Sequence, residues 1–336
     1  MALVLVILLN LTNSKKSVKY MLSKGENMGR LSIFEKRKIA IEELIKYYSE
    51  YRKIEFNNGE ELKGIEFRKK IHLLIKLILK LDELMSKEKI VIINDARTKE
   101  NNLPKIYACT HIGGNDIQRT FQIIGNPAYL MLGDPGILYK MPIYEALKLN
   151  GVIPLETKDR EDRKIAYARA IELLNKGGNL LIYPEGAWNV SPNVIVMKIF
   201  NGTVRMAKET GAEIIPIAVE QYGNTFYFNI GQNYTISKDD QTDINILKDE
   251  LRDKLATLKW SILETQKPGL RQFIPDDYLK TFQDDIVEKC NYGYGFSLED
   301  ALSEAFHDKT ITTEEEVFAF LDNIEINQNN AFLLRR

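Results

Sequence analysis

The chain has 336 residues, of which 44% are hydrophobic and 28% are charged, as expected for a globular protein with a substantial core. Its 46 basic and 47 acidic residues give a formal net charge of −1, which argues against a dominant nucleic-acid-binding role, because phosphate binding usually requires a basic excess. The two cysteines, Cys109 and Cys290, lack metal-ligand spacing. We interpret both as free thiols in a reducing compartment and expect no metal site.

The first 27 residues have two interpretations. Residues 2–9 are apolar and lysines follow them, but the run is too short to cross a membrane, and a secretory signal peptide carries its positive charge before the apolar run. Residues 24–26, Lys-Gly-Glu, can be encoded by a sequence like a bacterial ribosome-binding site, a short step before Met28. Residues 1–27 are therefore either a mis-assigned leader ahead of a true start at Met28, or a disordered leader.

Residues 28–88 are predicted to form a pair of helices. Ser32 and Glu35 have capping-box spacing and begin a helix that continues to about residue 52. The second helix spans about residues 60–86 and is apolar around most of its circumference. A narrow stripe of lysines follows one side of it: Lys69, Lys76, Lys80 and Lys87. Such a helix is either packed against the main domain, which we favour, or lies in a membrane interface with its lysines reaching the headgroups.

From residue 89 the pattern becomes that of an α/β domain, which we assign to residues 89–268. Seven apolar segments are predicted as strands: 90–93, 106–110, 128–132, 152–155, 180–183, 214–219 and 226–230. Helical segments separate several of them, and this alternation predicts a mixed, mostly parallel sheet with flanking helices. Pro216 lies inside one of the strands and indicates an edge strand or a bulge, because proline cannot donate to a ladder.

The end of the chain is predicted to be helical. Apolar residues at helical spacing predict a helix over about 244–262, ended by Pro268-Gly269. Residues 269–336 form a predicted helical extension, with acidic faces over 297–306 and 312–321. We expect this extension to act as a cap or an oligomer contact.

One pair of residues points to chemistry. His111 and Asp116 follow the second predicted strand, and Gly113 and Gly114 between them allow a tight strand-to-helix turn. Asp116 would then lie in the first helical turn, where its carboxylate can fix the imidazole tautomer and stabilise the protonated form, as a general base requires. Backbone amides at the helix start could also bind an oxyanion. Alone, the spacing fits equally well an aspartate that only caps a helix.

A second motif, Tyr183-Pro184-Glu185-Gly186, follows a later predicted strand. Four blocks now stand in the order found in the lysophospholipid acyltransferase superfamily, which includes 1-acylglycerol-3-phosphate acyltransferases, and the chain resembles this family over about residues 89–235. The blocks are His111 to Asp116, then residues 141–154, 183–186 and 214–219. Four blocks in order are far more specific than any single one.

The resemblance implies transfer of a fatty acyl group from acyl-CoA or acyl carrier protein to a hydroxyl of a lysophospholipid-like or other glycerol or sugar lipid. His111 would act as general base and Asp116 would orient it, while Glu185 and Gly186 would shape the acceptor site. It implies no bound cofactor, no metal and no nucleic-acid partner. We expect a cytoplasmic protein that binds peripherally to the inner face of the cell membrane.

Two positions depart from the family pattern. The third block of the family usually continues Gly-Thr-Arg, with an arginine that holds the acceptor phosphate, whereas here Trp188 takes that position and Asn189 follows. The second block usually ends its strand with another arginine, and here only Arg160 and Arg163, displaced along the loop, are available. Trp188 favours an acceptor with an apolar or sugar-like face, so these four residues complete the candidate substrate-binding set.

Two other functions fit the same residues. The chain could be an acyl-thioester hydrolase, in which the His111–Asp116 pair activates water in place of an acceptor hydroxyl. It could also be a membrane-associated lipid-binding protein without catalysis. A serine hydrolase is disfavoured, because the sequence has no Gly-x-Ser-x-Gly motif.

Overall fold

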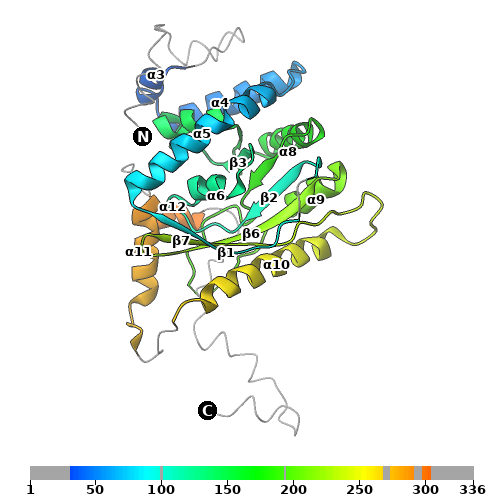
Figure 1. The fold of residues 1–336 in the computed structure, drawn as a ribbon. Helices are drawn as coiled ribbons and strands as arrows, with labels where there is room; N and C mark the ends of the chain where they lie inside the picture. Colours follow the sequence, from blue (N-terminus) through cyan, green and yellow to red (C-terminus); the bar gives the residue numbers. More distant parts are fainter. Residues whose placement is uncertain (1–30, 99–100, 193, 268–272, 291–296, 304–336) are drawn as a thin grey trace, which may run out of the picture. The chain divides into compact units, whose positions relative to one another are not determined.

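The computed structural model describes residues 31–98, 101–192, 194–267, 273–290 and 297–303. The leader (residues 1–27) and the predicted acidic helix at 312–321 lie outside the described residues. A seven-stranded sheet, in the order β1-β7-β6-β2-β5-β3-β4, forms the centre of the described fold (Figure 1). Its strands are β1 (Lys89–Asp95), β2 (Lys105–Cys109), β3 (Tyr129–Gly133), β4 (Val152–Leu155), β5 (Leu180–Ile182), β6 (Glu213–Tyr222) and β7 (Thr225–Ile230).

The sheet is mixed and mostly parallel, which confirms the predicted fold class. Strands β6, β2, β5, β3 and β4 run in one direction. Strand β7 returns antiparallel to β6, and β1 pairs parallel to β7. All seven predicted strands are present, because apolar β-branched runs separated by helical segments are typical of buried parallel strands. The carboxyl ends of five strands therefore meet at one edge of the sheet.

Helices cover both faces of the sheet. On one face, α8 (Arg160–Asn175), α9 (Gly202–Thr210) and α10 (Ile244–Glu264) bury a core that includes Ile106 and Ala108 of β2. On the other face, α5 (Ile65–Ser86) and α6 (Asp116–Ile124) pack over Tyr107 and Cys109. Successive β2 side chains point to opposite faces, as strand geometry requires. Figure 1 shows α5 and α10 on opposite sides of the sheet.

The N-terminal helices differ from their predicted bounds. The capping box of Ser32 and Glu35 is present, but the single predicted helix is divided into α3 (Ile33–Arg37) and α4 (Ile41–Asn57). The break lets buried Lys36 pair with Glu145 at 2.5 Å. Helix α5 begins at residue 65 and not at 60, because the preceding segment is bound to α8. The Leu62 amide donates to the side chain of Glu172 in α8 at 2.6 Å.

Helix α5 packs on the main domain through one face only. Ile65 and Leu79 are buried, and Ile75 packs against the core. Much of the remaining circumference, including large apolar side chains, is exposed. Helix α5 therefore packs against the main domain, as favoured from the sequence, and leaves this part of its apolar surface exposed. Among the described residues, no helix has the length and apolar character needed to cross a bilayer.

Pro216 is not in an edge strand, because β6 lies inside the sheet, between β7 and β2. The predicted alternative, a bulge, is confirmed: β6 pairs with β7 from Ile217 and Ile230 onward, but the bridge from Ile214 to Tyr234 on the other side of Pro216 is shifted by one residue. The carbonyl of Ile217 accepts a bond from the Thr110 amide of the β2 side, whereas the carbonyl of Pro216 faces Gly231 and accepts its amide at 2.9 Å. The nitrogen of Pro216, which has no hydrogen to donate, faces the β7 side as well. It lies one residue before Ile217, where the β6–β7 pairing begins opposite Ile230. Pro216 therefore cannot return a hydrogen bond to Gly231, and the regular β6–β7 ladder ends beside it.

The remaining helices lie after β3 and after α10. A short 3₁₀ turn (Leu138–Lys140) and α7 (Pro142–Asn150) lead into β4. In the C-terminal extension, α11 (Tyr278–Cys290) and α12 (Leu298–Ser303) are described. Helix α12 occupies part of the segment predicted at 297–306.

Candidate active site

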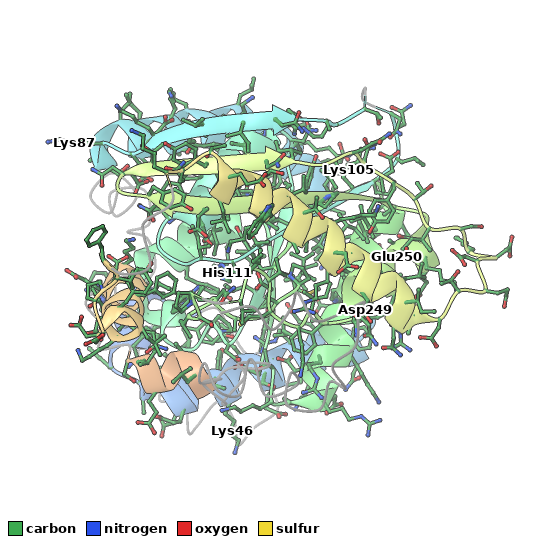
Figure 2. All side chains as sticks on the ribbon, turned by 90° about the horizontal axis from the view of Figure 1, so that it is seen from below. Lys46, Lys87, Lys105, His111, Asp249 and Glu250 are labelled. Carbon is green, nitrogen blue, oxygen red and sulfur yellow. The ribbon has the colours of Figure 1, made fainter. Side chains whose placement is uncertain are left out.

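The two motifs meet at the carboxyl edge of the sheet. His111 follows the end of β2 and Glu185 follows the end of β5, and these two strands are parallel neighbours. Carboxyl ends of adjacent parallel strands are the usual position of sites in α/β folds. In Figure 2, His111 lies well inside the outline of the molecule, whereas the labelled surface lysines Lys46 and Lys87 lie at its margin. The His111 side chain is 13% exposed, so it is open to a substrate on a small part of its surface.

His111 and Asp116 form a tight pair. Nδ1 of His111 lies 2.7 Å from Oδ2 of Asp116, whose side chain is fully buried at the first position of α6. Gly113 and Gly114 both have positive φ values, 87° and 61°, which is the tight turn that their position predicts. With Nδ1–H donated to the carboxylate, Nε2 is left as the basic nitrogen of the neutral ring.

Asp116 does more than begin a helix. Its Oδ2 also accepts the amides of Ile112 at 2.9 Å and Gly113 at 3.0 Å. Both amides belong to the loop before α6, so the carboxylate holds this loop and the imidazole together. Because these two loop amides donate to Asp116, they are not available to an oxyanion.

Glu185 braces the backbone of His111. Its Oε1 accepts the His111 amide at 3.0 Å, and its Oε2 accepts the Met197 amide at 2.9 Å. The His111 carbonyl in turn accepts the Asn189 amide at 3.0 Å. Burial raises the pKa of the Glu185 carboxyl, opposed by the charge of Lys259 and by the two amides. The loop after β5 therefore holds His111 at both backbone polar groups.

The second motif is a support more than a contact surface. Glu185 is completely buried and both of its oxygens accept backbone amides, so its carboxylate positions the loops of the site and does not face an acceptor. The Asn189 side chain is also buried, donates to the Val194 carbonyl at 2.6 Å and accepts the Ser191 amide at 3.1 Å. It shapes its own loop.

Gly186 is exposed and needs its positive φ of 71°. A Cβ at this position would lie 2.4 Å from Cε2 of Phe200, closer than any real contact. Only glycine therefore fits this turn beside the site.

Two aromatic rings flank the imidazole. Tyr183 stacks on His111 with ring centroids 4.2 Å apart and an angle of 29° between the planes. Trp188 approaches at 6.1 Å and 69°, in an edge-on arrangement. The Trp188 side chain is half-buried. Of the candidate substrate-binding residues, Trp188 is thus the one whose side chain lies beside the base.

Arg160 and Arg163 are not brought to the base. Both lie in the first turn of α8, after β4. Three strand spacings separate β4 from β2, which is about 14 Å at roughly 4.8 Å per spacing. Arg163 donates to the Thr157 carbonyl of its own loop. They share the carboxyl edge of the sheet with His111 but lie outside contact distance.

Two basic residues of α10 belong to the surroundings of the site and were missed from sequence. Arg252 donates to the carbonyls of Val196 and Met197 at 2.8 to 3.1 Å, which fixes the segment whose amide binds Glu185. Lys259 is buried and pairs with Glu220 at 3.3 Å. A signal for Lys259 existed, because it lies four residues after buried Leu255, in a stripe that is otherwise apolar.

Cys109, two residues before His111, is a free thiol, as expected, and is completely buried. Its Sγ lies 3.7 Å from Oγ1 of Thr120, and burial raises its pKa well above the ordinary value for a thiol. A nucleophilic cysteine needs an accessible thiolate, so Cys109 is not suited to carry an acyl group. Within the described residues, no group of three or more His, Cys, Asp or Glu side chains could hold a metal ion.

Comparison with known proteins finds acyltransferases that are similar to the segment around this site. Residues 89–220 match the family model described as "Acyltransferase". The 1-acyl-sn-glycerol-3-phosphate acyltransferase of Borreliella burgdorferi is 25% identical over 182 residues, which cover 48% of this chain and 72% of that protein. A chloroplastic enzyme of the same name from Arabidopsis thaliana is 24% identical over 153 residues, covering 46% of this chain and 42% of the plant protein.

A solved structure, the 1-acyl-sn-glycerophosphate acyltransferase of Thermotoga maritima, aligns with 67% of this chain and 91% of its own, at 16% identity and a TM-score of 0.45. The chain spans less than half of the plant relative. All four sequence blocks and the whole His111–Asp116 pair fall within the matched segment. Residues 89–220 therefore resemble an acyltransferase domain, and the names of the relatives support the lysophospholipid acyltransferase superfamily.

Proposed function

We propose that this protein is a glycerolipid O-acyltransferase. It transfers a fatty acyl group from acyl-CoA or acyl carrier protein to a free hydroxyl of a lysophospholipid-like or other glycerol or sugar lipid. The observation that carries the proposal is the 2.7 Å contact between His111 Nδ1 and Asp116 Oδ2, at the carboxyl edge of an acyltransferase-family sheet. The names of the curated relatives, 1-acyl-sn-glycerol-3-phosphate acyltransferases, support a glycerolipid acceptor.

The reaction proceeds in one displacement. Nε2 of His111 takes the proton of the acceptor hydroxyl as its oxygen attacks the thioester carbonyl. The new ester C–O bond forms and the C–S bond breaks, and the departing thiolate receives the proton from the imidazolium, which leaves the ring neutral. Asp116 stabilises the imidazolium while it exists. The inaccessible thiol of Cys109 supports direct attack without an acyl-cysteine.

Acyl transfer is tested with the purified full chain and palmitoyl-CoA. Thiol release is followed with and without 1-acylglycerol or 1-acylglycerol-3-phosphate, and the lipid product is identified by mass spectrometry. We expect acceptor-dependent thiol release that falls about 10²- to 10⁴-fold in His111→Ala. His72→Ala is the matched control, because His72 lies on α5 and binds the Gly125 carbonyl.

The same assay separates the competing functions. Thiol release that does not depend on any acceptor would identify a thioester hydrolase. Unchanged turnover in a folded His111→Ala protein would remove the proposed general base.

We also propose that the protein attaches to the inner face of the cell membrane through α5. Seven apolar side chains of this helix are more than half exposed: Phe67, Leu73, Leu74, Leu77, Leu81, Leu84 and Met85. At about 100° per residue they span an arc of roughly 120°. Exposed Lys69, Lys76 and Lys80 flank this arc on one side. An exposed apolar arc bordered by lysines is typical of a helix lying in a membrane interface.

Membrane attachment is tested by flotation with liposomes that contain anionic lipid. Leu77→Glu and Leu81→Glu, separately and together, should abolish co-flotation, and Lys76→Glu should weaken it. Ile246→Glu, on the exposed side of α10, is the control and should float like the wild type. Equal flotation of all variants would exclude α5 as the attachment surface.

A further inference from the structure

Helix α11 contacts the loop that follows β5. Buried Gln283 directs its side-chain Nε2 toward the Val190 carbonyl at 3.4 Å. Val190, Ile286 and Ala301 form a small buried cluster, so α11 and α12 both pack against this loop. These helices lie outside residues 89–220, the segment that matches the acyltransferase family.

The same helix also reaches the loop that follows β2. A Cβ built on Gly114 would lie 3.7 Å from Cβ of Lys289, near the end of α11. Gly114 stands between His111 and Asp116 in the turn that holds the pair. Helix α11 thus bridges the two loops that position the base.

Trp188 connects these helices with the imidazole. Its ring centroid is 6.1 Å from that of His111. The same side chain packs against the buried cluster of Val190, Ile286 and Ala301, and so do Phe282 of α11 and Leu302 of α12. The indole is therefore supported by the C-terminal helices while it lies beside the base.

The acceptor must pass close to this aromatic surface. A hydroxyl that gives its proton to His111 has to approach Nε2 to about 3 Å. Glu185 and Asn189 are turned into the protein and occupied there. Tyr183 stacks on the imidazole but is buried, so Trp188 is the partly exposed one of the two rings beside the base. An indole offers an apolar ring and one donor but no charge to pair with a phosphate.

We infer that α11 and α12 form a wall of the acceptor site, and that Trp188, held in place by Phe282 and Ile286, selects acceptors whose group next to the reacting hydroxyl is uncharged. This inference rests on the proposed function, because it assumes that an acceptor hydroxyl binds at His111. It assigns the C-terminal extension a direct part in substrate selection. Trp188 contacts the acceptor, and Phe282 and Ile286 are positioning residues.

Tryptophan fluorescence tests the wall without turnover. The chain has two tryptophans, and Trp260→Phe removes the exposed one on α10, so that emission then reports on Trp188 alone. Short-chain 1-acylglycerol is titrated below its micellar concentration, against 1-acylglycerol-3-phosphate of the same chain length. We expect the uncharged lipid to shift the emission at a several-fold lower concentration.

Variants of the wall complete the test. Phe282→Ala and Ile286→Ala should raise the half-saturating acceptor concentration and the acceptor KM several-fold, while the KM for acyl-CoA stays unchanged. Phe282→Leu serves if the alanine variant does not fold. Lys280→Ala is the matched control, because Lys280 lies on the exposed side of α11 and pairs with Asp284. It should behave like the wild type.

The two proposals fail in different ways. Acyl transfer that proceeds without any acceptor-induced change in Trp188 emission, or folded wall variants with unchanged acceptor KM, would overturn the wall. Saturable acceptor binding at Trp188 without acyl transfer would overturn the proposed function and leave the wall intact.

Discussion

Replacing Asp116 by asparagine separates the charge of the pair from its geometry. The asparagine amide oxygen can take the place of Oδ2 and accept the same three bonds, from His111 Nδ1 and the amides of Ile112 and Gly113. Its NH₂ group would then occupy the position of Oδ1, which is buried and has no hydrogen-bond partner among the described residues. The substitution leaves the loop in place but removes the negative charge that faces the imidazolium.

The size of the effect follows from the 2.7 Å separation. At an effective dielectric constant of about 20, a unit charge pair at this distance gains about 6 kcal/mol. The asparagine retains its hydrogen bond to Nδ1, so about half of this value or more is lost when the imidazolium forms. Since about 1.4 kcal/mol corresponds to a tenfold change in rate, we expect kcat to fall about 10²- to 10⁴-fold.

The assay is acceptor-dependent thiol release at saturating donor and acceptor, with the melting temperature measured in parallel. His111→Ala provides the comparison, because two residues that act as one unit are not additive. Adding Asp116→Asn to the His111→Ala protein should therefore cost little further activity. A folded Asp116→Asn protein that retains activity within tenfold of the wild type would refute the role of the carboxylate.

Three further predictions concern the supports of the site and of the fold. Glu185→Gln turns an NH₂ group toward a backbone N–H and should lower the free energy of unfolding by about 1–3 kcal/mol. Because burial raises the pKa of Glu185 above 4.5, the free energy of unfolding of the wild type should fall as pH rises from 4.5 to that raised pKa. Urea unfolding at several pH values should show this slope in the wild type and not in the variant. Gly186→Ala should lower the melting temperature more than Gly211→Ala, since both glycines have a positive φ but a Cβ at Gly211 meets no described atom within 4 Å; equal shifts would contradict the predicted clash. Asp159→Asn retains the helix cap but loses the ion pair with Lys53 at 2.9 Å. Hydrogen bonding to Lys53, against the opposing effect of burial, lowers the pKa of Asp159 from 3.8 to about 2. As pH falls from 3.8 to about 2, the wild type should therefore lose the contribution of this pair, at most about 1 kcal/mol of its free energy of unfolding, and the variant should show no such loss.

The elements of the fold were predictable because their signals are local. Apolar β-branched runs located all seven strands, and the spacing of Ser32 and Glu35 located a capping box. The break between α3 and α4 was not predictable, because it accommodates the long-range pair of Lys36 and Glu145. The strand order was not predictable either, since pairing between strands far apart in sequence leaves no local pattern.

The site divides in the same way. The spacing of His111 and Asp116, with glycines between them, indicated a turn that brings the two side chains together, and they lie at 2.7 Å. A motif gives the identity of a residue but not the direction of its side chain, which is why Glu185 was assigned to the acceptor although it turns toward the His111 backbone. Arg252 had no sequence signal, because its partners are main-chain carbonyls.

The tryptophan at the usual arginine position and the helices beyond the family domain are two parts of one arrangement. An arginine at Trp188 would place its guanidinium against the cluster of Val190, Ile286 and Ala301, where a charge without a partner is costly to bury. An indole fills the same position with apolar surface and is stabilised by that cluster. Packing of α11 and α12 against this loop therefore favours tryptophan over arginine at position 188. The absence of an arginine there in turn allows α11 and α12 to pack against the loop after β5.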